Sequence, residues 1–407
     1  MNMGPTAENQ PVLTSSPTLR LIHAAFVLTG VVTTLLGPIL PVLTARWSLN
    51  DAQAGYLFAA QFLGSMAGVA LSSFLVPRRG YQRSLVVGLA TMAGGVGTLA
   101  IGGWSLGLAS VFGYGIGLGI TIPTANLFIA GANPGRRAAA LNLLNLAWGV
   151  GAISWPALAS FFFDRDQFRA PLLGLSLALG AASIGIAYVP FVLAERGIKQ
   201  ARSLPKLDGP RTRQLALLLG ALFFLYVGTE NALGGWVASY AERFGNAPRS
   251  GWMLTPSAFW GALLLGRAAA PSVLRHLSES AHGLAGLVMA TLGVSVLLIT
   301  DAFPVMITGA ALAGFGLAPV FPFAVSILSE HYGSLATRVG GAAFAMGGLG
   351  GATLPWLVGF QSAQWGSLKT GLLVPLVATL AMIGLHLCSG RVLPVQVREA
   401  IARTPRM

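Results

Sequence analysis

Long apolar segments alternate with short polar segments along this chain. Apolar runs of about 20 residues, each long enough to cross a bilayer as a helix, are separated by short polar segments. We place twelve spans, at 19–45, 52–76, 84–103, 106–130, 138–162, 170–192, 213–240, 251–273, 283–300, 303–328, 337–361 and 369–389. The pattern predicts an all-α polytopic membrane protein embedded in the lipid bilayer.

Composition supports this fold class. Charged side chains make up 9% of the residues and hydrophobic ones 54%, whereas soluble domains carry about 25% charged residues. The 53 glycines favour close helix packing, because small residues let helices approach each other within a membrane. Cys388 is the single cysteine, which excludes an internal disulfide and a cysteine-based metal site.

An internal repeat divides the chain into two halves. LGPILPVLTARW at 36–47 aligns with LGGWVASYAERF at 233–244, and GLG at 117–119 aligns with GFG at 314–316, both 197 positions later. We therefore predict a tail at 1–18, a six-helix half at 19–193, a linker at 194–212, a second six-helix half at 213–389 and a tail at 390–407. In duplicated transporters of this kind the substrate site lies between the halves, near the midplane.

The basic residues predict the orientation of the chain in the membrane. With both termini inside, 18 of the 25 Lys and Arg residues fall on the cytoplasmic side, as the positive-inside rule requires. The net charge of +13 is spread over short loops rather than one helix face, so it predicts topology and no nucleic-acid partner. We expect both termini in the cytoplasm and a plasma (inner) membrane of the bacterial type.

Twelve spans, a repeat and a basic central linker resemble the major facilitator superfamily over residues 19–389. Three stretches of the second half resemble its fucose–galactose–glucose:proton symporter group: LYVGTENALGGW at 225–236, FWGALLLGR at 259–267 and GFGLAPVFP at 314–322. The resemblance implies twelve helices in two six-helix halves, and transport of a small sugar-like molecule together with protons.

The chain departs from that family at two places. The loop signature between the second and third spans has Pro77 where an Asp is usual. The first and fourth spans, which carry acids in some members, contain no Asp or Glu here, and the aligned fourth-span position is near Ile122. Neither the latch supported by that Asp nor proton coupling through those acids carries over to this chain.

Glu230 is the acidic residue that we place deep in a span; the other 11 of the 12 fall in tails, loops or span ends. An ionised carboxylate at the midplane costs roughly 3 kcal/mol. A carboxyl group that alternates between dry and wet surroundings can load and release a proton, because burial disfavours the ionised form. Glu230 is therefore the candidate proton-coupling residue, and the alternative is a structural Glu bonded to a neighbouring helix.

Arg267 is the candidate charge partner of Glu230. It is the cation placed well inside a span, roughly 24 Å from the outer end of its helix at 1.5 Å per residue. Its long side chain can reach Glu230 or extend to the cytoplasmic interface. Of the two positions, the interfacial one is favoured.

Amides, hydroxyls and aromatic rings within the spans predict the solute. A sugar needs neutral donors and acceptors for its hydroxyls and an aromatic face for its C–H side. The predicted substrate-binding residues are Gln61, Asn126, Asn145, Trp148, Tyr226, Glu230 and Asn231. The alternative is that such polar residues hold helices together, at about 0.6–2 kcal/mol each.

The leading hypothesis is proton-coupled uptake of a monosaccharide or similar neutral polar solute by a monomer, through alternating access. A drug/proton antiporter and an uncoupled facilitator remain open, as does a receptor or lipid-binding protein on the same scaffold. The five histidines lack metal-ligand spacing, and GGLGGA at 347–352 lacks the lysine of a P-loop, so we expect no metal and no cofactor. No Ser/His/Asp set converges on a span, and enzyme chemistry has no support.

Overall fold

A computed structural model describes residues 16–133, 136–163, 167–189, 191, 210–246, 249–332 and 336–392. Helices make up nearly all of this part of the chain, and none of it forms a strand. The predicted tail at 390–407 and linker at 194–212 lie almost wholly outside the described residues, as do positions 1–15 of the N-terminal tail.

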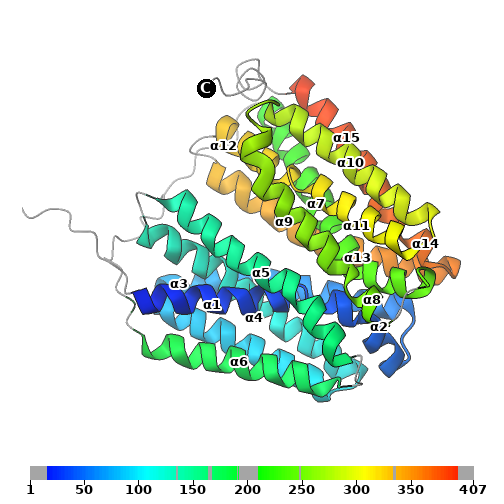
Figure 1. Cartoon of the computed structure of the whole chain (residues 1–407). Coiled ribbons are helices and arrows are strands. Elements are labelled where there is room, and N and C mark those ends of the chain that lie inside the picture. The colour runs from blue at the N-terminus through cyan, green and yellow to red at the C-terminus, as the bar shows by residue number, and fades with distance from the viewer. Residues whose placement is uncertain are drawn as a thin grey trace, which may run out of the picture.

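The helices gather in two groups, in order along the chain (Figure 1). The first group consists of α1 (Ser16–Thr33), α2 (Leu36–Trp47), α3 (Asp51–Ile101), α4 (Trp104–Ala132), α5 (Arg137–Phe163) and α6 (Arg169–Tyr188). The second consists of α7 (Pro210–Phe244), α8 (Arg249–Met253), α9 (Thr255–Val273), α10 (Glu279–Ile299), α11 (Phe303–Leu317), α12 (Val320–Tyr332), α13 (Ala336–Trp365), α14 (Leu368–Gly371) and α15 (Leu373–Val392).

Nine described helices are long and apolar enough to cross a bilayer, and the bent pair α1–α2 makes a tenth. The remaining two of the twelve predicted spans are the second part of α3 and the helix α9, which contains Arg267. Helix positions agree with the predicted spans to within several residues. The span predicted at 170–192 is too long, because α6 ends at Tyr188.

Proline and glycine explain the breaks that the span pattern did not predict. α1 and α2 meet at a bend of 44°, where Pro38 has no N–H for the carbonyl of Thr34 and its ring crowds that carbonyl. α11 and α12 are interrupted in the same way at Pro319. α3 is continuous through the 78–83 loop signature except at Gly80, where φ is 77° and ψ 170°, a backbone conformation that favours glycine.

The two groups touch through α3 and α13, α2 and α7, and α5 and α9. Glycine permits close approaches here: a Cβ atom at Gly37 of α2 would overlap the carbonyl oxygen of Gly234 of α7, and one at Gly359 of α13 would overlap that of Asp51 of α3. Figure 1 shows the groups meeting around α2, α8 and α13 and separating toward the other end. We call the end near Asp51, where they meet, the closed end, and the opposite one the open end.

Candidate functional site

A small pocket lies between the two groups. Both groups contribute to its wall, through α1, α2 and α3 on one side and α7 and α9 on the other. The residues that line it are Thr33, Thr34, Leu36, Gly37, Phe58, Gln61, Asn231, Gly234, Gly235 and Trp260. The interface between the halves, where the repeat predicted a site, thus contains a pocket with amide, hydroxyl and indole groups.

The amide of Gln61 is held on both sides. Its Nε2 donates to the carbonyl of Thr33 at 3.0 Å, and its Oε1 accepts from the hydroxyl of Tyr114 at 2.9 Å. Tyr114 is fully buried, so this bond satisfies a phenol that has no access to solvent. Gln61 therefore lines the pocket with a fixed orientation, and part of its hydrogen-bonding capacity is used in holding α1, α3 and α4 together.

Two tryptophans face each other across the interface. Trp148 of α5 and Trp260 of α9 meet edge to face, with ring centroids 5.9 Å apart and an interplanar angle of 84°. The indole N–H of Trp148 donates to the hydroxyl of Thr33 at 3.2 Å. The pair places one indole ring from each half at the interface, and of the two rings that of Trp260 lines the pocket.

A charged cluster lies beside the pocket on the second half. The Tyr226 hydroxyl donates to Oε1 of Glu230 at 2.9 Å. Arg267 donates through Nη2 to the Tyr226 oxygen at 2.9 Å and to the same Oε1 at 3.2 Å. The side chains of Arg267 and Glu230 are 33% and 12% exposed. The favoured interfacial position of Arg267 was wrong: its side chain turns to the carboxylate, because the ion pair satisfies two charges that the apolar surroundings would otherwise penalise.

Aromatic rings form one side of this cluster. The ring of Tyr226 lies 5.9 Å from that of Phe321, which also contacts Phe223 and Phe344. Such rings keep water from that side of the ion pair, and charges interact more strongly where water is excluded. The Nε atom of Arg267 is buried there without a hydrogen-bond partner among the described residues.

The structure separates the remaining predicted residues into two sets. Asn231 lines the pocket, although its Nδ2 donates to the Val227 carbonyl of its own helix. Asn126 and Asn145 also donate within their own helices, and neither is part of the pocket wall. Both amides thus take part in local helix bonding in this conformation.

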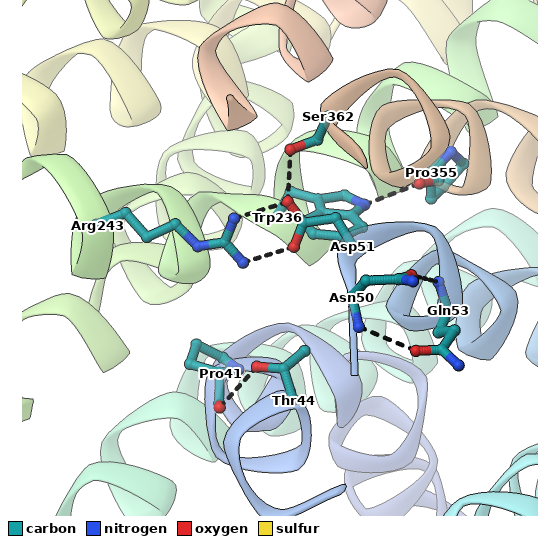
Figure 2. A network of polar contacts seen from close by, with 9 residues as sticks. All are labelled: Pro41, Thr44, Asn50, Asp51, Gln53, Trp236, Arg243, Pro355 and Ser362. Atoms are coloured by element: carbon teal, nitrogen blue, oxygen red, sulfur yellow. Dashed lines mark hydrogen bonds and ion pairs between the residues drawn. The ribbon is translucent and has the colours of Figure 1, made fainter. Parts of the chain in front are cut away.

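A second polar network closes the site at the closed end (Figure 2). The carboxylate of Asp51, the first residue of α3, accepts two hydrogen bonds from Arg243 of α7, at 2.7 and 2.6 Å. Ser362 of α13 donates to the same carboxylate, and Trp236 of α7 donates to the carbonyl of Pro355 at 2.8 Å. One carboxylate of the first half is therefore bound by two helices of the second.

This network was missed at the sequence level. Asp51 and Arg243 were both placed at span ends, and each on its own is the ordinary polar residue of a helix terminus. The available signal was that the two residues carry opposite charges and lie at the same predicted membrane face. The two residues are 192 positions apart in the sequence, so their pairing depends on the tertiary arrangement of the helices.

In the described part of the chain, no group of three His, Cys, Asp or Glu side chains is placed to hold an ion. The site consists instead of neutral polar groups, two indoles and one buried ion pair.

Two known relatives are similar in sequence to this chain, one over most of its length and the other over less than half of it. The glucose/mannose transporter GlcP of Bacillus subtilis is 24% identical over 358 residues, which cover 84% of this chain and 87% of that protein. The multidrug efflux protein YfmO of Bacillus subtilis is 30% identical over 183 residues, covering 44% of this chain and 42% of that protein.

Solved structures match the fold over nearly its whole length. A bacterial homologue of the human lysosomal transporter Spinster, crystallised inward-facing and unoccupied, has a TM-score of 0.75 at 13% identity and covers 98% of this chain and 100% of its own. The fucose:proton symporter FucP of E. coli has a TM-score of 0.61 at 17% identity, with coverages of 91% and 98%. These likenesses confirm the predicted fold of twelve transmembrane helices in two six-helix halves.

The family model described as Major Facilitator Superfamily matches residues 22–355, which is most of the chain. Together with the sugar transporters among the relatives, this match confirms the resemblance that the sequence motifs predicted. The chain belongs to the major facilitator superfamily of membrane transporters.

Proposed function

We propose that the protein is a secondary active transporter that takes up a monosaccharide-like solute together with protons. The observation that carries the proposal is Glu230, a carboxylate on a membrane-spanning helix, next to the pocket between the halves and 12% exposed. A buried carboxylate that faces a cavity in turn from each side of the membrane can carry a proton across. The relatives named as glucose transporters support a sugar-like solute.

The proposed orientation places both termini in the cytoplasm of a cell with a bacterial-type inner membrane. The halves would then be residues 19–193 and 213–389, joined by the linker at 194–212. In this orientation the closed end near Asp51 faces outward and the open end faces the cytoplasm. The structure would thus represent the inward-facing state of a monomer that works by rocking its halves.

Each predicted binding residue has a proposed role in that cycle. Gln61, Asn231 and the pair Trp148–Trp260 would bind hydroxyls and the apolar side of a sugar ring. Tyr226 and Glu230 would bind solute and proton together. Asn126 and Asn145 would join the binding surface only in another conformation, when the helices around them have moved.

Transport in proteoliposomes tests the proton step. We expect Glu230→Gln to abolish accumulation driven by a pH gradient while solute counterflow persists, because the amide keeps the shape but cannot exchange a proton. Glu279→Gln is the matched control, since Glu279 lies at the start of α10 and accepts from Ser326. Undiminished pH-driven accumulation in the Glu230 variant would overturn the proposal.

A drug/proton antiporter is the second candidate, favoured by the match to the multidrug efflux protein over 44% of the chain. An uncoupled facilitator is the third, since the first and fourth spans carry no acid. Efflux of a lipophilic cation against its gradient would indicate the antiporter. Solute equilibration that is independent of pH would indicate the facilitator, and absence of any solute flux would indicate a receptor or lipid-binding protein.

A further inference from the structure

The positive charge of Arg267 bears on which solute can bind, and the proposed proton step does not account for that charge. The cluster is electrically neutral only while Glu230 is ionised. Among the described residues, the charged or titratable groups that contact the carboxylate are Tyr226 and Arg267. When Glu230 takes up a proton, the guanidinium is left as a cation without a counter-ion.

No other described side chain is placed to compensate that charge. Only a carboxylate could do so, and described carboxylates elsewhere have partners of their own: Asp51 binds Arg243, Glu279 accepts from Ser326 and Asp301 binds Lys369. Besides Glu230, Arg267 contacts the phenol of Tyr226, whose ring packs against Phe321. A charge left unpaired in such surroundings is strongly disfavoured, so an anion must bind at Arg267 for the proton to load readily.

The geometry leaves donors for such an anion. Arg267 uses Nη2 for Tyr226 and Glu230, whereas among the described residues Nη1 has no hydrogen bond and Nε is buried without a partner. A guanidinium binds a carboxylate through two parallel N–H···O bonds. A solute carboxylate that replaces Glu230 on Nη2 can also engage Nη1, and one guanidinium matches one negative charge.

In this conformation the cavity between the halves has a volume of about 10 Å³, so its residues can contact a sugar-sized body only after the halves have moved apart there. Trp260 lies on the same helix as Arg267, seven residues earlier, which places the two positions on one face and roughly 10 Å apart along the axis. Asn231 and Trp260 line the pocket beyond the charged cluster. A six-carbon acid with a hydrogen bond at each end can bridge that spacing.

We propose that the solute is a sugar acid, a polyhydroxylated monocarboxylate that binds through its carboxylate to Arg267 while Glu230 holds the proton. This inference rests on the proposed proton-coupled uptake and narrows its solute from a neutral sugar to an anion. Proton and anion load together because protonation of Glu230 removes the counter-ion of Arg267, and the bound anion supplies a new one. The transported charge is then zero, whereas proton-coupled uptake of a neutral sugar moves one positive charge.

Binding to the unaltered protein gives the first test. Purified protein at pH 5.5 should be thermally stabilised by glucuronate and gluconate and not by glucose or by the methyl ester of glucuronate, and the stabilisation should weaken at pH 8. The ester keeps the hydroxyls and removes the charge. Equal stabilisation by glucuronate and its methyl ester would overturn the inference.

Transport in proteoliposomes gives the second test. Labelled glucuronate should accumulate under an inward proton gradient, at a rate that an imposed membrane potential does not change. Arg267→Gln should raise its half-saturation constant by about 10- to 100-fold, because the charge-assisted hydrogen bonds to the carboxylate are lost. Lys369→Gln, which removes a cation paired with Asp301 at the closed end, should leave uptake unchanged.

The outcomes separate this inference from the proposed function. pH-driven accumulation of glucose that glucuronate does not inhibit overturns the sugar-acid assignment and supports proton-coupled sugar uptake. Absence of pH-driven accumulation of both solutes, in protein that melts cooperatively, overturns the proposed function and this inference with it.

Discussion

Replacing Asp51 by Asn should shift the protein away from the conformation in which the closed end is shut. Asp51 belongs to the first half, and both of its side-chain partners, Arg243 and Ser362, belong to the second. The bonds exist only while the two halves meet at this end. The variant therefore destabilises one conformation of the transport cycle and leaves the other untouched.

The magnitude follows from geometry and exposure. Fully exposed ion pairs contribute about 0.2–1 kcal/mol, and breaking a fully buried pair costs about 3–5 kcal/mol. Asp51 is 12% exposed and Arg243 34%, so solvent screens one partner and not the other. We take about 2 kcal/mol as the intermediate value, which corresponds to a shift of roughly 30-fold in the conformational equilibrium.

Cysteine labelling measures that shift. Cys388, the single cysteine of the chain, is first replaced by Ser, and Thr34→Cys then places a thiol in the pocket wall. In intact cells, a membrane-impermeant thiol reagent added outside should react up to about 30-fold faster in the Asp51→Asn background. Arg243→Gln should have a similar effect, because it removes the other partner of the same bonds.

The controls separate gating from a general loss of stability. Asp301→Asn breaks an ion pair with Lys369 that lies within the second half, so it should not change the labelling rate. The exchanged pair Asp51→Arg with Arg243→Asp should restore slow labelling in part, since the charges are again opposite. Unchanged labelling in both single variants would refute the gating role of this network.

Three further predictions follow from single contacts. Gln61→Leu should lower stability by about 1–3 kcal/mol in a thermal melt, because the buried Tyr114 hydroxyl loses its acceptor, and an unchanged melt would contradict that role. Gly80→Ala should cost about 1–3 kcal/mol through backbone strain at φ 77°, although no atom lies in the way of a Cβ, and equal stability would indicate that the backbone relaxes there. Trp148→Ala should weaken solute binding about tenfold or more by removing one ring of the pair with Trp260, as measured by counterflow, and unchanged half-saturation would place the solute elsewhere.

The sequence predicted the helices well, because a bilayer requires long apolar segments whose backbone groups are bonded internally. It did not predict how those segments bend. The α1–α2 bend depends on Pro38, yet α4 and α5 contain Pro123 and Pro156 and continue. Whether a proline interrupts a helix depends on what neighbouring helices supply to the freed carbonyl, which no local pattern records.

The sequence predicted which kinds of side chain form the site, but not which of them form hydrogen bonds and ion pairs with one another. Glu230 stood out because a carboxylate inside a membrane is costly wherever its side chain points. The favoured position of Arg267 was wrong, since a long side chain reaches either the carboxylate or the interface with the same backbone. Hydrogen bonds such as Gln61–Tyr114 depend on how whole helices are rotated about their axes, and spacing along one segment does not determine that rotation.

Equivalent positions of the repeat make different contacts in the two halves. Thr33 aligns with Glu230, and in the structure Thr33 accepts from Trp148 whereas Glu230 pairs with Arg267. Arg46 aligns with Arg243; the first lies over the ring of Phe168 within its own half, and the second binds the carboxylate of the other half.

The ionic contacts at the site and at the closed end thus both centre on α7, which carries Glu230 and Arg243 on one helix. A helix that bears the proposed proton site and also holds the closed end gives the two events a direct mechanical connection, because a movement of α7 that follows loading at Glu230 also acts on Arg243.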